Sequence, residues 1–234
     1  MSIQPQRHFG QKHLPLVISL ILLLGACYSA PKSSIIHNEF PAEIRSEERY
    51  VIYLHGRIIE DQGLEHPTSP VFGAYEYDAI LTALAVEGLQ VISEVRPKDA
   101  DPFQHANQLA DHVQDLLDVG VPPDHITIVG VSKGGAIAIL TALLLQNDNL
   151  QFVFLASCGE EVLDDQSLTI AGRMLSIYEA ADDMALSCQP LFERSSTGST
   201  FQEIRLETGL GHGEFYTPRA DWIEPTVRMA LGED

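Results

Sequence analysis

The sequence has few basic residues, few cysteines and no long hydrophobic run. Of its 234 residues, 14 are Lys or Arg and 33 are Asp or Glu, which gives a formal net charge of −19. So acidic a chain is a poor partner for nucleic acids, because phosphate backbones are bound by clustered cations. Three cysteines are too few for a disulfide-rich scaffold. An apolar content of 45 % instead favours one globular domain with a substantial core.

The most hydrophobic stretch lies near the N-terminus, at residues 14–26, and is shorter than the roughly 20 residues that span a bilayer. Arg7 and Lys12 precede it, and no acidic residue does. This arrangement predicts a secretory signal peptide over residues 1–26. We expect residues 27–48, which are mostly polar and contain two prolines, to form a tether to a folded domain at residues 49–234.

The end of this stretch, Leu24-Gly25-Ala26-Cys27, resembles the lipobox of bacterial lipoproteins. The resemblance implies that Cys27 is lipidated and becomes the new N-terminus. The protein would then be held at a membrane of the bacterial cell envelope by its acyl chains, facing the periplasm. Tyr28 stands where an Asp would imply retention at the inner membrane, so the resemblance favours the outer membrane. The alternative is an ordinary signal peptide followed by a chance cysteine.

From residue 50 onward, short apolar runs alternate with amphipathic stretches of helical length. This alternation predicts an α/β fold with a mostly parallel sheet and helices on both faces. The predicted strands span residues 50–54, 90–95, 125–131, 151–156, 174–178 and 201–206, and the predicted helices span 72–87, 103–119, 134–146 and 221–231.

The motif Gly130-Val131-Ser132-Lys133-Gly134 lies between a predicted buried strand and a predicted buried helix. In the G-x-S-x-G nucleophile elbow, a sharp strand-to-helix turn exposes the Ser hydroxyl, and glycines relieve the crowding on either side. The helix N-terminus that follows favours a developing oxyanion. The alternative is a structural Ser at the start of a helix after a Gly-rich turn.

With this motif, the chain from about residue 50 to its end resembles the α/β-hydrolase superfamily. The resemblance implies a triad in the order Ser, acid, His, with Ser132 as nucleophile. His212 is the only histidine after Ser132, and it sits in a Gly-His-Gly loop after the last predicted strand. For the acid we favour Asp182, with Asp183 next. Asp164 and Asp165, one strand earlier, are further alternatives.

The same resemblance implies an oxyanion hole made of two backbone N–H groups. One comes from Lys133, and the other comes from the loop His55-Gly56-Arg57, where we favour Arg57 over Gly56. We take His55, Gly56 and Arg96 as candidates for the substrate pocket, and residues 57–77 as its wall. The Lys133 side chain either pairs with an acid or meets an anionic part of the substrate.

Three further features of the sequence concern a possible disulfide, a possible metal site and a possible cap domain over the active site. Cys158 and Cys188 follow neighbouring predicted strands, so they form either a disulfide or two buried thiols. His105 and His112 share a helix face, but no metal-binding motif accompanies them, so we expect neither a metal nor another cofactor. Residues 157–173 are too few for a large cap domain.

These observations predict a lidless serine hydrolase, most simply a carboxylesterase acting on small or accessible esters. Thioesters, amides and peptides come next as substrate classes. The alternative is a protein that is not an enzyme: a catalytically silent α/β-hydrolase-fold lipoprotein that binds a partner or a ligand in the pocket where the family has its active site. A metal-dependent hydrolase is the third hypothesis for the function. The sequence does not indicate the substrate or the oligomeric state.

Overall fold

A computed structural model of the chain describes residues 1, 2, 4, 35–195 and 197–233. Cys27 and the apolar stretch before it lie outside the described residues. Backbone contacts separate the unit Met1–Ala30 from the unit Pro31–Asp234, and the sheet and helices described below belong to the second unit. Among the described residues, no helix has both the length and the apolar character needed to cross a membrane.

The second unit is built on a seven-stranded sheet in the order β1-β5-β2-β6-β7-β8-β9, with every neighbouring pair parallel. A separate two-stranded antiparallel hairpin is formed by β3 and β4. The strands are β1 (Ile35–His37), β2 (Arg49–Leu54), β3 (Thr68–Ser69), β4 (Gly73–Ala74), β5 (Leu89–Ile92), β6 (Ile126–Val131), β7 (Gln151–Leu155), β8 (Arg173–Glu179) and β9 (Thr200–Leu206).

Helices connect the parallel strands, as crossovers of this kind require. The longest are α3, α4 and α7, and the others are short. The α-helices are α1 (Arg57–Gln62), α2 (Tyr77–Leu84), α3 (Pro102–Val119), α4 (Lys133–Leu145), α5 (Glu160–Asp164), α6 (Gln189–Glu193) and α7 (Ala220–Leu231), and two 3₁₀ turns span Pro123–His125 and Gly211–Tyr216.

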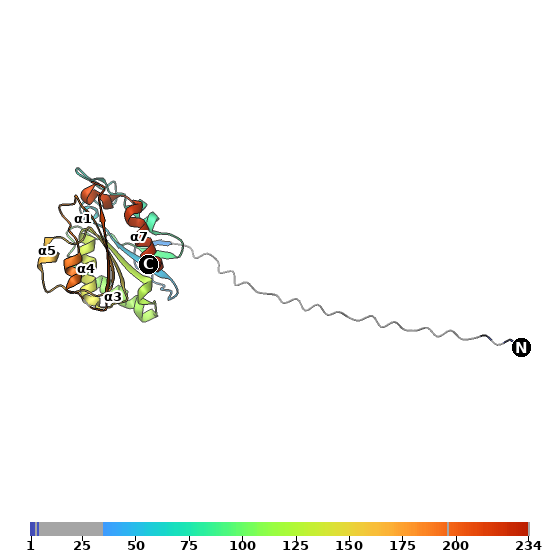
Figure 1. Cartoon of the computed structure of the whole chain (residues 1–234). Helices are drawn as coiled ribbons and strands as arrows, with labels where there is room; N and C mark the ends of the chain where they lie inside the picture. The colour runs from blue at the N-terminus through green and yellow to red at the C-terminus, as the bar shows by residue number, and fades with distance from the viewer. Residues whose placement is uncertain (3, 5–34, 196, 234) are drawn as a thin grey trace. The chain divides into compact units, whose positions relative to one another are not determined.

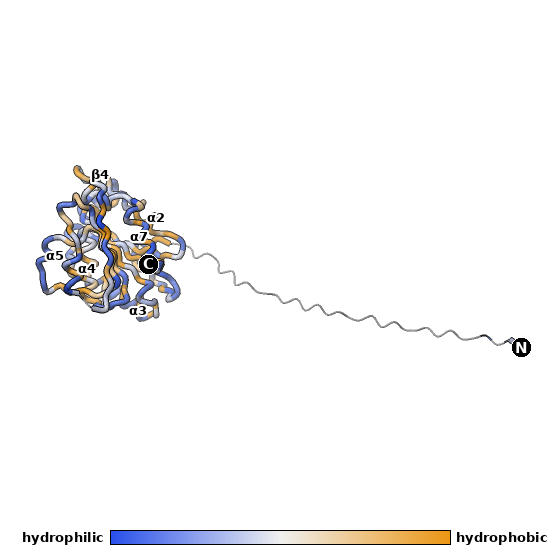
Figure 2. The backbone as a smooth tube through the Cα atoms, in the orientation of Figure 1, coloured by the Kyte–Doolittle hydropathy of each residue, from blue (hydrophilic) through white to orange (hydrophobic). Residues whose placement is uncertain are grey.

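The sheet separates two hydrophobic cores, because successive side chains of a strand point to opposite faces. In β7, Phe152 and Phe154 pack with α3 and α4, whereas Val153 and Leu155 pack with α2 and α7. Figure 1 shows α4 and α7 on opposite sides of the strands, and Figure 2 shows hydrophobic segments concentrated at the centre of this unit. Each large side chain buried in this way contributes about 1.5–3 kcal/mol.

The mostly parallel sheet with helices on both faces confirms the predicted fold class. The segment between β7 and β8 carries only the five-residue helix α5, so no large cap domain stands there. A helix predicted over residues 72–87 begins later, at Tyr77, because Gly73–Ala74 pairs with Thr68–Ser69.

The sheet also begins earlier than expected. Ile35–His37, which lies within the stretch expected to be a tether, pairs in parallel with β5 at the edge of the sheet. The side chains of His37 and Gln90 add a hydrogen bond of 3.1 Å across this pair. The free N–H and C=O groups of an edge strand explain how a segment of only three residues can join the sheet.

Candidate active site

Ser132 lies at the sharp turn between β6, which ends at Val131, and α4, which begins at Lys133. Its backbone has φ 53° and ψ −119°, a combination that non-glycine residues rarely adopt and that costs about 1–3 kcal/mol. A Cβ on Gly130 would overlap the carbonyl of Gly134, and a Cβ on Gly134 would overlap the carbonyl of Leu54. Both glycines are therefore required by close approach of the backbone, and the turn has the strained geometry of a nucleophile elbow.

His212 and Asp182 are brought together from two separate loops. The Nδ1 of His212 lies 2.7 Å from Oδ2 of Asp182, and this carboxylate is fully buried. The other oxygen of Asp182 accepts the backbone N–H of Met184 at 2.9 Å, which fixes the carboxylate in place. The contact between Nδ1 of His212 and Asp182 assigns the Nδ1–H tautomer to a neutral His212. Nε2 is then left free to accept a proton.

The other acids considered for this role are all exposed. Asp183 is exposed and lines a cavity. Asp164 ends α5 and is also exposed. Asp165 follows it and accepts hydrogen bonds from both the backbone and the hydroxyl of Ser167. The imidazole of His212 is thus joined to Asp182, the residue favoured from the sequence.

Ser132 and His212 line the same two cavities. One, of about 370 Å³, is bordered by exposed acids, and the other, of about 290 Å³, is mainly apolar and aromatic. The apolar cavity takes part of its wall from residues 57–77, as expected. Its lining includes Gly56, Arg57, Ile58, Ser69, Phe72, Tyr75, Val131, Met184 and Tyr216, and the acidic cavity includes Ser157, Glu160, Glu161 and Asp183.

Glu179, at the end of β8, holds the acid loop and the histidine loop together. Its side-chain oxygens accept backbone N–H groups from Ala181 at 2.6 Å, Gly209 at 3.0 Å and Gly211 at 3.1 Å. Burial alone would raise the pKa of Glu179, but these backbone hydrogen bonds outweigh burial and lower it. The sequence analysis did not single out Glu179, because two of its three backbone donors lie 30 and 32 positions further along the chain.

The two amides proposed for an oxyanion hole occupy equivalent places in the fold. Lys133 is the first residue of α4 and Arg57 is the first residue of α1, and the first amides of a helix have no partner within the helix. The amide of Gly56, the alternative donor, points to the hydroxyl of Tyr75 at 3.4 Å. Arg57 and Ser132 border the same apolar cavity. This geometry favours Arg57 over Gly56.

His55 is fully buried and shapes the loop that carries Arg57. Its Nδ1 lies 2.9 Å from the carbonyl of Gly56, and its Nε2 accepts the backbone N–H of Arg96 at 3.0 Å. Burial, followed by the nearby charge of Arg96, lowers the pKa of His55 to about 3. A neutral imidazole that donates from Nδ1 satisfies both hydrogen bonds.

The structure does not place Arg96 or His55 in the wall of either cavity beside Ser132, although both were candidates for the substrate pocket. Arg96 is 4 % exposed, and its Nε donates to Oε1 of Glu60 at 2.8 Å. Lys133 forms an ion pair with the other oxygen of Glu60. Lys133 thus pairs with an acid, the first of the two possibilities considered for its side chain.

Cys158 and Cys188 are joined by a disulfide, the first of the two alternatives weighed from the sequence. Cys158 follows β7, and its backbone also bridges to Leu186. The covalent link and this bridge tie the loop that contains Asp182 to the end of the neighbouring strand.

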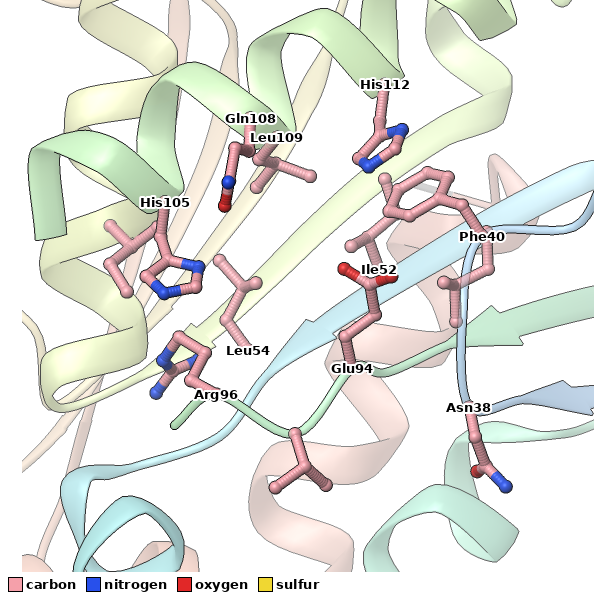
Figure 3. A pocket seen from close by; sticks show the side chains of 13 residues that line it. Asn38, Phe40, Ile52, Leu54, Glu94, Arg96, His105, Gln108, Leu109 and His112 are labelled. Carbon is pink, nitrogen blue, oxygen red and sulfur yellow. The ribbon is translucent and has the colours of Figure 1, made fainter. Parts of the chain in front are cut away.

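A third cavity, of about 450 Å³, lies between α3 and the sheet and contains neither Ser132 nor His212 (Figure 3). Phe40 stacks on His112 at one end, with ring centroids 3.9 Å apart, and Arg96 and His105 lie at the other. Within the part of the chain that the structure describes, no group of three or more His, Cys, Asp or Glu side chains is placed to hold a metal ion.

Comparison with known proteins identifies the fold. No protein-family model and no curated protein sequence matches the chain. The crystal structure of Arabidopsis thaliana SOBER1 is 15 % identical and covers 77 % of this chain and 99 % of its own, with a TM-score of 0.50. A structure described as an arylesterase is 14 % identical and covers 82 % of this chain and 77 % of its own, with a TM-score of 0.52.

A predicted CIB-like hydrolase from Thermoplasma acidophilum is 17 % identical and covers 81 % of this chain and 89 % of its own, with a TM-score of 0.50. At such identities the likeness concerns the fold alone. The chain adopts a lidless α/β-hydrolase fold.

Proposed function

We propose that the protein is a serine hydrolase that acts by acyl transfer, with a carboxylic ester as its substrate. The observation that carries this proposal is the geometry around Ser132. A strained elbow presents this serine to the same two cavities as His212, and His212 is hydrogen-bonded to a buried Asp182.

In the proposed reaction, the Oγ of Ser132 attacks the ester carbonyl while Nε2 of His212 takes its proton. Asp182 holds the Nδ1–H tautomer and stabilises the imidazolium that forms. The amides of Lys133 and Arg57 bind the oxyanion, and each such donor is worth about 3–4 kcal/mol in the transition state. His212 then protonates the leaving alcohol, and water, activated by the same imidazole, hydrolyses the acyl-enzyme.

The cavities beside Ser132 suit a small ester. The apolar one, at about 290 Å³, is large enough for a short acyl chain or an aromatic ring, and Phe72, Tyr75 and Tyr216 offer it aromatic contacts. The likeness to a structure described as an arylesterase is in keeping with this substrate class. Thioesters, amides and peptides undergo the same acyl transfer and are the next candidates.

A fluorophosphonate probe tests the proposal, because it reacts covalently with an activated serine. We expect the wild type to be labelled and the variant Ser132→Ala to remain unlabelled. Ser157 lines one of the same cavities but lies outside the proposed triad, so Ser157→Ala is the matched control and should keep its label. A folded wild type that is not labelled would instead favour a silent hydrolase fold that binds a ligand or partner.

We further propose that a lipidated Cys27 attaches the mature protein to a membrane of the bacterial envelope. Of the two membranes, we favour the outer one. The lipobox-like sequence before Cys27 supports this placement. Metabolic labelling with a fatty-acid analogue, followed by fractionation of the envelope, tests it. We expect label and membrane association in the wild type and loss of both in Cys27→Ser. Equal distribution of the two proteins would refute the anchor.

A further inference from the structure

Three charged side chains from distant parts of the sequence meet between α1 and α4, the helices that carry the proposed oxyanion donors. Glu60 comes from α1, Lys133 begins α4, and Arg96 follows β5. We call these three residues the charge cluster. Their side chains are 1 %, 18 % and 4 % exposed, respectively, so Glu60 and Arg96 are buried, whereas Lys133 is partly exposed and lines the acidic cavity beside Ser132.

Every charged group of the cluster has polar partners. Glu60 accepts Nε of Arg96 at 2.8 Å through one oxygen and Nζ of Lys133 through the other. Lys133 also donates to the carbonyl of Ala100 at 2.7 Å, and Arg96 donates to the carbonyl of His55. Burial alone would raise the pKa of Glu60, but the hydrogen bonds from Lys133 and Arg96 outweigh burial and lower it. The cluster therefore carries two positive charges and one negative charge.

The position of the cluster connects the two proposed oxyanion donors. One donor is the amide of Lys133 itself, and the other is the amide of Arg57, three residues before Glu60 in the same short helix. The ion pair between Lys133 and Glu60 therefore ties the first residue of α4 to α1, and these two helices carry the two donors. Six-residue helices such as α1 are not stable alone, so its position depends on tertiary contacts of this kind.

Stability alone does not account for this arrangement. Replacement of a buried ion pair by apolar residues is often neutral or stabilising, because removing charges from water is costly. A cation in the first turn of a helix also opposes the helix dipole. A net positive charge on the helices that carry two N–H donors, however, favours the negative charge that develops on the substrate oxygen in the transition state.

We propose that the Lys133 side chain is a positioning residue, which acts through Glu60 to hold the amides of Lys133 and Arg57 in register for the oxyanion. This inference rests on the proposed hydrolase function. It assigns the lysine inside the G-x-S-x-G motif a role that is separate from contact with substrate.

The test compares Lys133→Met, Lys133→Arg and, as a control, Lys98→Met. Lys98 is exposed, so its replacement removes one positive charge from the protein without touching Glu60. Lys133→Met keeps the backbone amide and leaves Glu60 paired with Arg96. The measurements are kcat and KM for a p-nitrophenyl ester, with kcat expressed per active site titrated by a fluorophosphonate, and the inhibition constant of a boronic acid that forms a tetrahedral anion on the serine.

We expect Lys133→Met to lower kcat about 10- to 100-fold, below the effect of removing a donor outright, with KM within about twofold. The boronic acid should bind more weakly by a similar factor. Lys133→Arg should recover most of the kcat, and Lys98→Met should match the wild type.

A kcat per titrated site within about twofold of the wild type in Lys133→Met would overturn the inference. An equal loss of substrate and boronate affinity with kcat unchanged would overturn it as well, because it would indicate substrate binding. Neither result would affect the proposed function, which fails if the folded wild type is not labelled by the fluorophosphonate or if Ser132→Ala keeps the ester hydrolysis of the wild type.

Discussion

Asp182 and Asp183 are neighbours in sequence, and the fold places their carboxylates in different environments. The Asp182 carboxylate is fully buried and hydrogen-bonded to His212, whereas Asp183 is exposed. From the sequence we favoured this short segment as the source of the acid, because it follows a strand that precedes the histidine loop, and we kept Asp164 and Asp165 as alternatives. The sequence favoured Asp182 over Asp183, but the hydrogen bond to His212 depends on which carboxylate the turn directs inward, and that is a property of the fold.

The first prediction separates these two carboxylates. Asp182→Asn should lower kcat by about 10⁴-fold, because the amide cannot hold His212 in the required tautomer or stabilise its charged form. Asp183→Asn should change kcat less than about threefold, because an exposed carboxylate contributes little to the charge of the imidazole. Steady-state hydrolysis of a p-nitrophenyl ester measures both, and a reversed order would assign the role to Asp183.

The role of Glu179 as a common anchor for two loops cannot be read from its residue type. Its three backbone donors are separated from it by two, thirty and thirty-two positions, so nothing in the local sequence signals them. Glu203 offers a matched comparison, because it also accepts a backbone N–H, from Cys188 at 2.8 Å, but does not contact the histidine loop.

We predict that Glu179→Gln lowers the free energy of unfolding by about 1.5–3 kcal/mol, because an amide nitrogen would face backbone donors in place of a charged oxygen. It should also lower kcat, because the loops that carry Asp182 and His212 lose their common anchor. Glu203→Gln should lose stability and keep its kcat. Urea unfolding and ester hydrolysis measure the two effects, and the same kcat in both variants would count against the anchoring role.

The strand, turn and helix that form the nucleophile elbow are the part of the fold that the sequence predicts best. A buried apolar strand, a Gly-x-Ser-x-Gly turn and an apolar helix are all local features, and the structure places them at β6, Ser132 and α4. The sequence did not predict two of the elements that the structure contains, α1 and β1, because they depend on contacts with distant parts of the chain. Helix α1 has only six residues, too few for a hydrophobic period, and its contacts to Arg96 and Lys133 span 36 and 73 positions. Strand β1 has only three residues, and it pairs with β5 at the edge of the sheet.

The third prediction concerns close packing at the elbow. Gly134→Ala should destabilise the fold by several kcal/mol, because the added Cβ would overlap the carbonyl of Leu54 in the adjacent strand and neither backbone can move freely. Gly56→Ala is the control, since a Cβ there meets no atom closer than 3.7 Å. Thermal unfolding followed by circular dichroism compares them, and equal midpoints would contradict the packing argument.

For the whole molecule, the buried polar groups beneath the site imply sensitivity to acid. The pKa of His55 is about 3 in the folded chain and 6.5 in the absence of burial. Below pH 6.5 the unfolded chain binds a proton that the folded chain does not. Stability is therefore full above pH 6.5 and falls as the pH drops toward 3. Glu60 and Glu179, whose pKa values are lowered, add to the loss in acid.

The fourth prediction isolates His55 within this behaviour. Between pH 6.5 and 3 the histidine should cost the wild type as much as about 5 kcal/mol of unfolding free energy. His55→Gln cannot titrate, so its free energy of unfolding should fall less steeply over this range, even if it is less stable at neutral pH. Urea unfolding at a series of pH values gives both slopes. Parallel slopes would mean that His55 does not stay neutral in the fold.

The central claim, that Ser132 becomes acylated with the help of His212 and Asp182, can be measured directly. A p-nitrophenyl ester is mixed with the protein, the reaction is quenched in acid within its first turnover, and the digested protein is analysed by mass spectrometry. We expect the acyl group on the peptide that contains Ser132, and no acylated peptide in Ser132→Ala. Ester hydrolysis by the wild type with the acyl group on another residue, or with equal turnover in Ser132→Ala, would contradict the account.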